Sequence, residues 1–121
     1  MKALLRISSI IELLTGLLLI VAPNIVGELL LNVSLKEISE IILALICGCA
    51  LITIGIACWL GSTSIAAKVI VESLLFYNIA IAVVVMYAFI HFSLSNIPFS
   101  LVACLHLIMA FFCFKILKNK S

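Results

Sequence analysis

Four long apolar segments, each long enough to cross a bilayer as a helix, restrict this chain to very few folds. They run from about Leu4 to Ala22, from Ile38 to Leu60, from Ala66 to Ile90 and from Ile97 to Leu117. A helix needs roughly 20 apolar residues to cross a hydrocarbon core of about 30 Å, and it satisfies its backbone hydrogen bonds internally. Strands of a membrane barrel would alternate polar and apolar residues, which these segments do not. The sequence therefore predicts an all-α polytopic membrane protein.

The composition excludes several classes of protein. Of the 121 residues, 67% are hydrophobic and 10% are charged, whereas a soluble domain is about 45–50% apolar and about 25% charged. A soluble globular domain, a disordered chain and a basic nucleic-acid binder are therefore excluded. Because the later connections are short, we expect one membrane domain over residues 1–121, an antiparallel four-helix bundle whose main partner is the lipid bilayer.

The basic residues are distributed unequally between the two sides of the membrane. Four spans place both termini and the middle connection on one side, which holds all of the 7 Lys and Arg except Lys36. The positive-inside rule therefore predicts cytoplasmic termini. We expect the first span to be retained, because its apolar stretch is longer than that of a signal peptide and no small-x-small cleavage site follows. The basic residues on the predicted cytoplasmic side are Lys2, Arg6, Lys68, Lys115, Lys118 and Lys120.

The external loop at residues 23–37 mixes apolar residues with Asn24, Glu28 and Asn32. This pattern fits either a short interfacial helix that caps the bundle or a simple tether between two spans. We favour the tether, which needs no further structure.

Residues typical of helix ends flank the spans. Ser34 and Glu37 have the spacing of a capping box, which would begin the second long helix near residue 35. Gly61 suits the C-terminal cap of that helix. Asn96 and Pro98 are typical of an N-cap followed by a proline in the first helical turn.

The cysteines fall within the expected spans. Cys47 and Cys49 lie about 200° apart around a helix, which is a poor arrangement for one metal ion and differs from a Cys-x-x-Cys redox pair. We interpret the cysteines as small packing residues and expect no metal site, with redox or metal chemistry as the alternative. Ala44 and Gly48 form a small-x-x-x-small step that favours close helix contact. The full set is Cys47, Cys49, Cys58, Cys104 and Cys113.

Polar residues occur at one common depth in the spans. The span centres lie near residues 13, 49, 78 and 107, and Glu12, Cys49, Asn78 and His106 stand at or beside them. Antiparallel packing would bring these four residues to the same level. The predicted ligand- or proton-binding residues are Glu12, His106, Asn78, Tyr77, Thr15 and Cys49.

This midplane cluster has a structural and a functional interpretation. In the first, Glu12 is neutral or pairs with His106, and Asn78 completes a network that sets helix register. Interhelical hydrogen bonds of this kind contribute about 0.6 kcal/mol each. In the second, Glu12 and its helix-face neighbours Ser8 and Thr15 line a cavity that binds a ligand, a cation or a proton. We favour the second, because less costly residues than an intramembrane acid could set register.

Lys68, Glu72 and His91 are interpreted as structural rather than functional residues. Lys68 and Glu72 have the i, i+4 spacing of an ion pair at the membrane surface. His91 lies at the outer end of its span, about 20 Å along the helix from the midplane level of His106. The two histidines therefore cannot bind one haem within a single protomer. Trp59, near the cytoplasmic end of the second span, fits an aromatic belt.

Short motifs resemble those of small bacterial four-helix membrane proteins of the DoxX-like kind. The motifs are Leu5-Arg6, Glu12-Leu13-Leu14-Thr15-Gly16-Leu17, Gly55-Ile56-Ala57-Cys58-Trp59-Leu60, Tyr77-Asn78 and Leu105-His106, and together they span most of the chain. The resemblance implies a four-helix fold in a bacterial inner membrane. It implies no particular activity, because many of these proteins are uncharacterised.

The chain is also similar in architecture to small multidrug-resistance transporters. Those proteins have four short spans and a glutamate midway along the first, which exchanges protons for cationic drugs in a dimer. Glu12 matches that glutamate. The long external loop and the position of Trp59 at the end of the second span depart from that family.

Three functional hypotheses follow. The chain is a binding or transport protein for a small ligand, cation or proton, which is the hypothesis we favour. Alternatively, it is an accessory subunit of a larger membrane complex. The expected protein partners are accordingly a second copy of this chain or the subunits of such a complex. The third hypothesis is a membrane-embedded enzyme that acts on a lipid or quinone, with Glu12 and His106 as an acid/base pair. No motif identifies a cofactor.

Overall fold

The structure, a computed structural model, describes residues 1–94 and 96–119. This part of the chain forms five helices and no strand. All except the second are long and apolar enough to cross a membrane, which confirms the predicted all-α chain with four long apolar helices. Lys120, one of the basic residues used to predict topology, lies outside the described residues. The helices are α1 (Lys2–Val21), α2 (Pro23–Leu31), α3 (Ile38–Gly61), α4 (Ala67–Phe92) and α5 (Ile97–Lys118).

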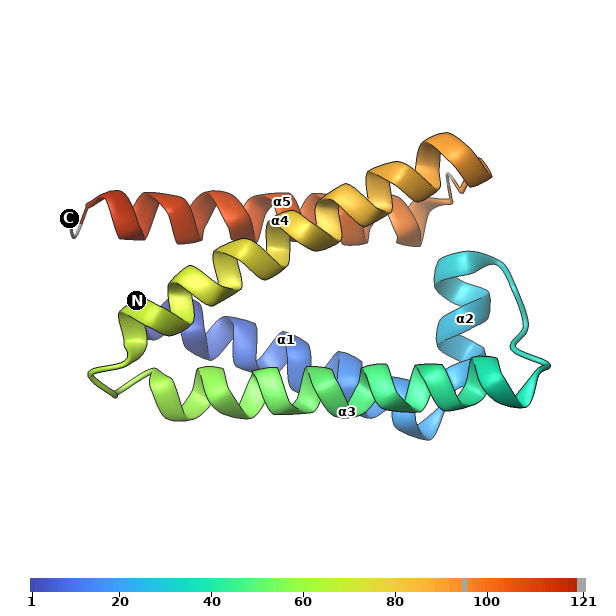
Figure 1. Cartoon of the computed structure of the whole chain (residues 1–121), viewed down its shortest axis with the longest axis horizontal. Coiled ribbons are helices and arrows are strands. Elements are labelled where there is room, and N and C mark those ends of the chain that lie inside the picture. The colour runs from blue at the N-terminus through green and yellow to red at the C-terminus, as the bar shows by residue number, and fades with distance from the viewer. Residues whose placement is uncertain (95, 120–121) are drawn as a thin grey trace.

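The long helices form two pairs. Helices α1 and α3 pack together extensively, and so do α4 and α5, whereas contacts between the two pairs are sparse (Figure 1). The pairs come together near the end of the molecule where both chain termini lie, and they diverge toward the other end. The short helix α2 lies across that wider end, where it contacts α1, α3 and α5. The molecule is therefore a wedge of two helix pairs.

The buried core lies in the narrow half of this wedge. Leu5 of α1 and Val71 of α4 are fully buried there, together with the thiols of Cys58 and Cys113 from α3 and α5. All five cysteines are free, and these two have the packing role that was predicted for them. Because the core occupies only the narrow half, space remains between the pairs farther along.

Glycines allow α1 and α3 to approach each other closely. A Cβ atom added to Gly16 would lie 2.7 Å from the carbonyl oxygen of Gly48, and one added to Gly48 would lie 2.8 Å from that of Gly16. A Cβ atom on Gly55 would meet the side chain of Leu13 at 2.7 Å. The predicted close contact at Gly48 is confirmed, and small residues account for the tightness of the α1–α3 pair.

The interpretation of the external loop as a tether is wrong for its first half, which forms α2. Pro23 lies in the first turn of this helix, where its missing N–H is not needed. Asn32 ends the helix in the left-handed conformation, with φ of 56°. The Asn96 side-chain amide donates a hydrogen bond to the Leu30 carbonyl at 3.0 Å, which links α2 to the start of α5.

The predicted capping box at Ser34 and Glu37 is also wrong, because the box lies three residues later. Helix α3 has Glu37 as its N-cap, and the Glu40 carboxylate accepts the backbone N–H groups of Lys36 and Glu37 at 2.9 and 3.1 Å. A carboxylate at the third helical position satisfies amides that the first turn leaves free.

Of the other two predicted helix ends, one is confirmed and one is wrong. The Asn96 side-chain oxygen accepts the backbone N–H of Phe99 at 2.8 Å, with Pro98 in the first turn, as expected. Gly61 is instead the last residue of α3 and has no positive φ. It makes room for the side chain of Ile70 rather than forming a left-handed cap.

Candidate functional site

A polar cluster joins α1, α4 and α5 midway along their lengths. Glu12 of α1 and Asn78 of α4 are buried. The Tyr77 hydroxyl donates a long hydrogen bond of 3.5 Å to the Glu12 carboxylate, and the Tyr77 ring meets the His106 ring edge-on at 5.7 Å. Successive residues of a helix point about 100° apart, so Tyr77 reaches α1 while Asn78 reaches α5. Helix α4 thus supplies the two residues that connect Glu12 with His106.

The hydrogen bonds of Asn78 determine which nitrogen of His106 carries a proton. The Asn78 amide nitrogen donates to the Leu74 carbonyl at 2.7 Å, so its side-chain oxygen faces His106. That oxygen can only accept, and His106 Nδ1 lies 2.8 Å from it. Nδ1 therefore carries a hydrogen, and in the neutral form of the ring Nε2 keeps its lone pair.

Glu12 has no basic partner among the described residues. No hydrogen bond or ion pair joins it to His106, and the ion pair found in this part of the chain is that of Lys68 and Glu72 at 4.0 Å, as predicted. Arg6, the basic residue nearest along α1, instead lies over the Trp59 ring, 5.3 Å from its centre. The direct Glu12–His106 pair considered from the sequence is absent, although Tyr77 contacts both residues.

A cavity of about 380 Å³ lies between the two helix pairs at this level. Glu12, Tyr77 and His106 contribute its main polar groups, and most of the remaining lining is aliphatic. Leu30 of α2 also lines the cavity, so the short helix forms part of its wall. The other lining residues are Ile11, Thr15, Cys47, Ala50, Leu51, Ile54, Ile81, Val102 and Leu105.

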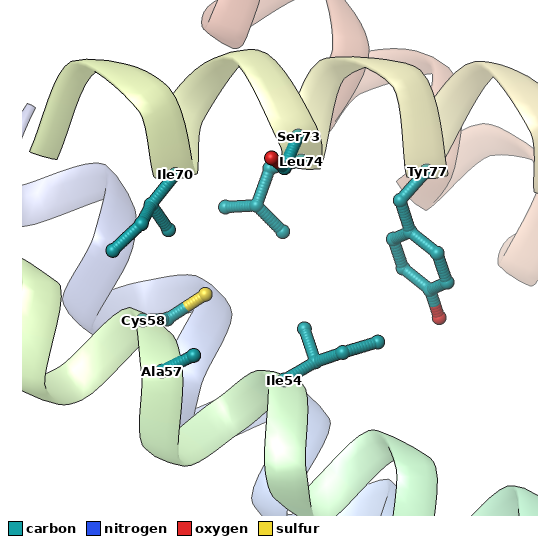
Figure 2. A pocket seen from close by; sticks show the side chains of 7 residues that line it. All are labelled: Ile54, Ala57, Cys58, Ile70, Ser73, Leu74 and Tyr77. Carbon is teal, nitrogen blue, oxygen red and sulfur yellow. The ribbon is translucent and has the colours of Figure 1, made fainter. Parts of the chain in front are cut away.

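A second cavity, of about 290 Å³, lies between α3 and α4 nearer the core. In Figure 2 the Tyr77 ring extends from α4 toward α3, and Cys58 and Ile54 of α3 face the same space. Ile54 and Tyr77 line both this cavity and the larger one. These two side chains therefore border both cavities.

The structure brings together most, but not all, of the residues predicted for the site. Thr15 lines the larger cavity, although its hydroxyl donates to the Ile11 carbonyl at 2.8 Å. Cys49 is exposed and lines none of the cavities described here, and Cys47 lines the larger cavity in its place. Cys49 was predicted for the site from its depth in the span, but depth does not determine the direction in which a residue points around the helix.

Leu30 and Cys47 are among the lining residues that were not predicted. Leu30 enters it only because residues 23–31 form a helix, and no polar pattern marks that residue. Cys47 lies on the same face of α3 as Ile54, seven positions farther along, but no pattern in the sequence shows that this face turns toward the site. Among the described residues, no group of three His, Cys, Asp or Glu side chains could hold a metal ion.

Comparison with protein-family models, with characterised proteins and with solved structures finds no match to this chain. The resemblance to DoxX-like proteins therefore stays a prediction from short motifs.

Proposed function

We propose that this chain is an antiparallel four-span protein of a bacterial inner membrane, with both termini in the cytoplasm, that binds a small lipophilic cation. The observation that carries the proposal is a buried carboxyl group, without a basic partner in the described chain, at the wall of a largely apolar cavity of about 380 Å³. Glu12 would supply the charge that attracts the cation, and the aliphatic walls would hold its apolar body.

Electrostatics supports this choice of ligand. An acidic side chain at the centre of a membrane helix costs about 2.5–3.5 kcal/mol on insertion scales. Such a group persists in hydrocarbon either with a bound proton or beside a positive charge. A site that alternates between these two states binds cations in exchange for protons, which is also the behaviour implied by the architectural similarity to small multidrug-resistance transporters.

The neighbouring cavity supports entry from the bilayer. Helices α3 and α4 follow each other in the chain but contact each other sparsely, and the cavity of about 290 Å³ lies between them. Ile54 and Tyr77 border both this cavity and the Glu12 cavity. A rotation of the Tyr77 ring would join the two spaces, so a ligand dissolved in the bilayer could reach Glu12 without crossing water.

The test measures binding of benzyltriethylammonium to purified protein in detergent by isothermal titration calorimetry. A quaternary ammonium carries no exchangeable proton, so any pH dependence of its affinity reports on the protein. We expect affinity to rise with pH, because protons compete with the cation for Glu12. We also expect Glu12→Gln to weaken binding at least about tenfold, or about 1.4 kcal/mol.

The matched control is Glu72→Gln, which removes an acid from the exposed Lys68–Glu72 pair on α4 and should leave affinity unchanged. A neutral analogue with carbon in place of nitrogen should bind much more weakly. Equal binding of the cation to the parent protein and to Glu12→Gln would exclude Glu12 as the binding group.

A second candidate function is an acid/base enzyme acting on a lipid or quinone. The observation in its favour is that Glu12 and His106 line the same cavity and could both reach one substrate. The two functions differ in outcome. A binding protein returns its ligand chemically unchanged, whereas incubation of an enzyme with extracted membrane lipids and quinones yields a new product by mass spectrometry.

A further inference from the structure

A much smaller chamber lies beside the large cavity, at the junction of α1, α4 and α5. Its volume is about 10 Å³, close to the lower limit for holding one water molecule. Polar side chains from all three helices surround it, in contrast to the aliphatic walls of the larger cavity. The lining residues are Ser8, Ile11, Glu12, Asn78, Leu105, His106 and Met109.

Ser8 independently indicates that this chamber holds a small polar molecule. Its side chain is only 2% exposed, and its hydroxyl has no hydrogen-bond partner within the described residues. Buried hydroxyl groups are normally paired with protein atoms or with ordered water. Ser8 lies one helical turn before Glu12 on the same face of α1, so a molecule in the chamber can contact both residues.

The donors and acceptors around the chamber match one water molecule. The Asn78 oxygen is already occupied by Nδ1–H of His106, which leaves Nε2 as the free acceptor on the ring. A water molecule can accept hydrogen bonds from the Ser8 hydroxyl and from the protonated Glu12 carboxyl group, and it can donate one to Nε2, three partners in all. A sodium ion would need more oxygen ligands than these side chains provide.

We propose that this chamber holds a water molecule bound to Ser8, Glu12 and His106, and that this water transfers protons between Glu12 and Nε2 of His106. In the transfer, the protonated Glu12 gives its proton to the water oxygen while the water gives one of its own protons to Nε2. The carboxylate and the imidazolium are formed together, the water is regenerated and total charge is unchanged.

The other titratable groups near Glu12 do not replace His106 as the proton acceptor. They are the phenol of Tyr77 on α4 and the thiols of Cys47 and Cys58 on α3. Each of these groups ordinarily carries its own proton at neutral pH, whereas a neutral imidazole offers a vacant lone pair. The water bridge therefore supplies the contact that Glu12 and His106 lack directly.

The test is nitrogen NMR of ligand-free protein labelled with ¹⁵N-histidine, reconstituted in lipid. The chain has 2 histidines, so His91 is an internal reference in every spectrum. We expect His106 to be protonated at Nδ1, its Nε2 signal to show an accepted hydrogen bond, and magnetisation from water to reach this ring. Protonation at Nε2 instead of Nδ1, or no transfer from water, would overturn the proposal.

Two serines on α1 give a matched pair of variants. Ser9 is also fully buried and unpaired within the described chain, but it does not line the chamber. We expect Ser8→Ala to shift the Nε2 signal toward that of a free ring nitrogen, and Ser9→Ala to leave it in place. An unchanged signal in Ser8→Ala, or an equal shift in both variants, would contradict the water bridge.

This inference does not depend on the ligand proposed for the larger cavity. The NMR measurements use protein without ligand, whereas the binding measurements compare Glu12→Gln with Glu72→Gln. Failure of one proposal is therefore recognised separately from failure of the other. If Ser8→Ala does not fold, the spectrum of the parent protein alone decides the question.

Discussion

At the scale of single residues, some polar groups of the site have well-formed hydrogen bonds and others do not. Asn78 uses both ends of its amide, toward Leu74 and toward His106, at 2.7 and 2.8 Å. Glu12 has one long hydrogen bond of 3.5 Å, from Tyr77. A well-formed hydrogen bond between buried groups stabilises a fold, whereas an acid with so little support is more costly to bury.

This difference predicts that substitutions at Glu12 and at Asn78 have opposite effects on the stability of the protein. We expect Glu12→Gln to leave the midpoint of thermal unfolding in detergent unchanged or higher, because an amide keeps a partner for Tyr77 and removes a potential buried charge. We expect Asn78→Leu to cost about 1–3 kcal/mol, because it leaves Nδ1–H of His106 unpaired. Large destabilisation by Glu12→Gln would assign that carboxyl group to a structural network and argue against a ligand site.

The sequence predicts the depth of a residue in a span but not the direction in which it points. Counting from the span centres correctly identified Glu12, Asn78 and His106 as neighbours. The same count also predicted Cys49, which does not line the cavity. The residue of α3 that does so is Cys47, two positions earlier and about 200° away around the helix. Direction depends on how the helices pack, and four mostly apolar helices carry little amphipathic pattern to reveal it.

At the scale of helices, glycines allow the close contact within the α1–α3 pair. Helices α1 and α3 meet through Gly16 and Gly48, where each added Cβ atom would fall within 3 Å of the facing carbonyl oxygen. A flexible side chain could move away from such a clash, but a backbone carbonyl group within a helix cannot. The spacing of Ala44 and Gly48 was enough to predict close packing, although not which helix would be the partner.

A substitution at this contact tests the pairing of α1 with α3. We expect Gly48→Val to destabilise the protein by about 1–3 kcal/mol, because the helices must move apart to admit the side chain. The measurement is unfolding by denaturing detergent, followed by circular dichroism. Cys49→Val adds a branched side chain at the next position, which is exposed, and should change stability little. Equal destabilisation by both variants would show that α3 is sensitive to a branched side chain at either position, and not specifically at the glycine contact.

At the scale of the whole molecule, the termini and the connection between α3 and α4 lie at one end, and α2 lies at the other (Figure 1). The topology proposed from the charge bias in the sequence would place the first end in the cytoplasm. The four spans could be predicted because hydrophobic length is a direct requirement of the bilayer. The wedge could not be predicted, because it depends on contacts between pairs that no local pattern encodes.

Membrane sidedness is tested with single introduced cysteines and a membrane-impermeant maleimide on intact cells. We expect Asn32→Cys, beside α2, to react from outside, and Ser64→Cys, between α3 and α4, to react only after the membrane is opened. The native cysteines lie within the long helices, and the parent protein measures their background labelling. The reverse pattern would invert the proposed topology.

The division of the wedge into two consecutive halves has a consequence for biosynthesis. Glu12 belongs to the first pair, whereas Tyr77, Asn78 and His106 all belong to the second. During translation the α1–α3 hairpin is made first, so Glu12 enters the bilayer before any of these partners exists. The cluster is therefore absent from the nascent hairpin and is completed only when the second half of the chain packs against the first.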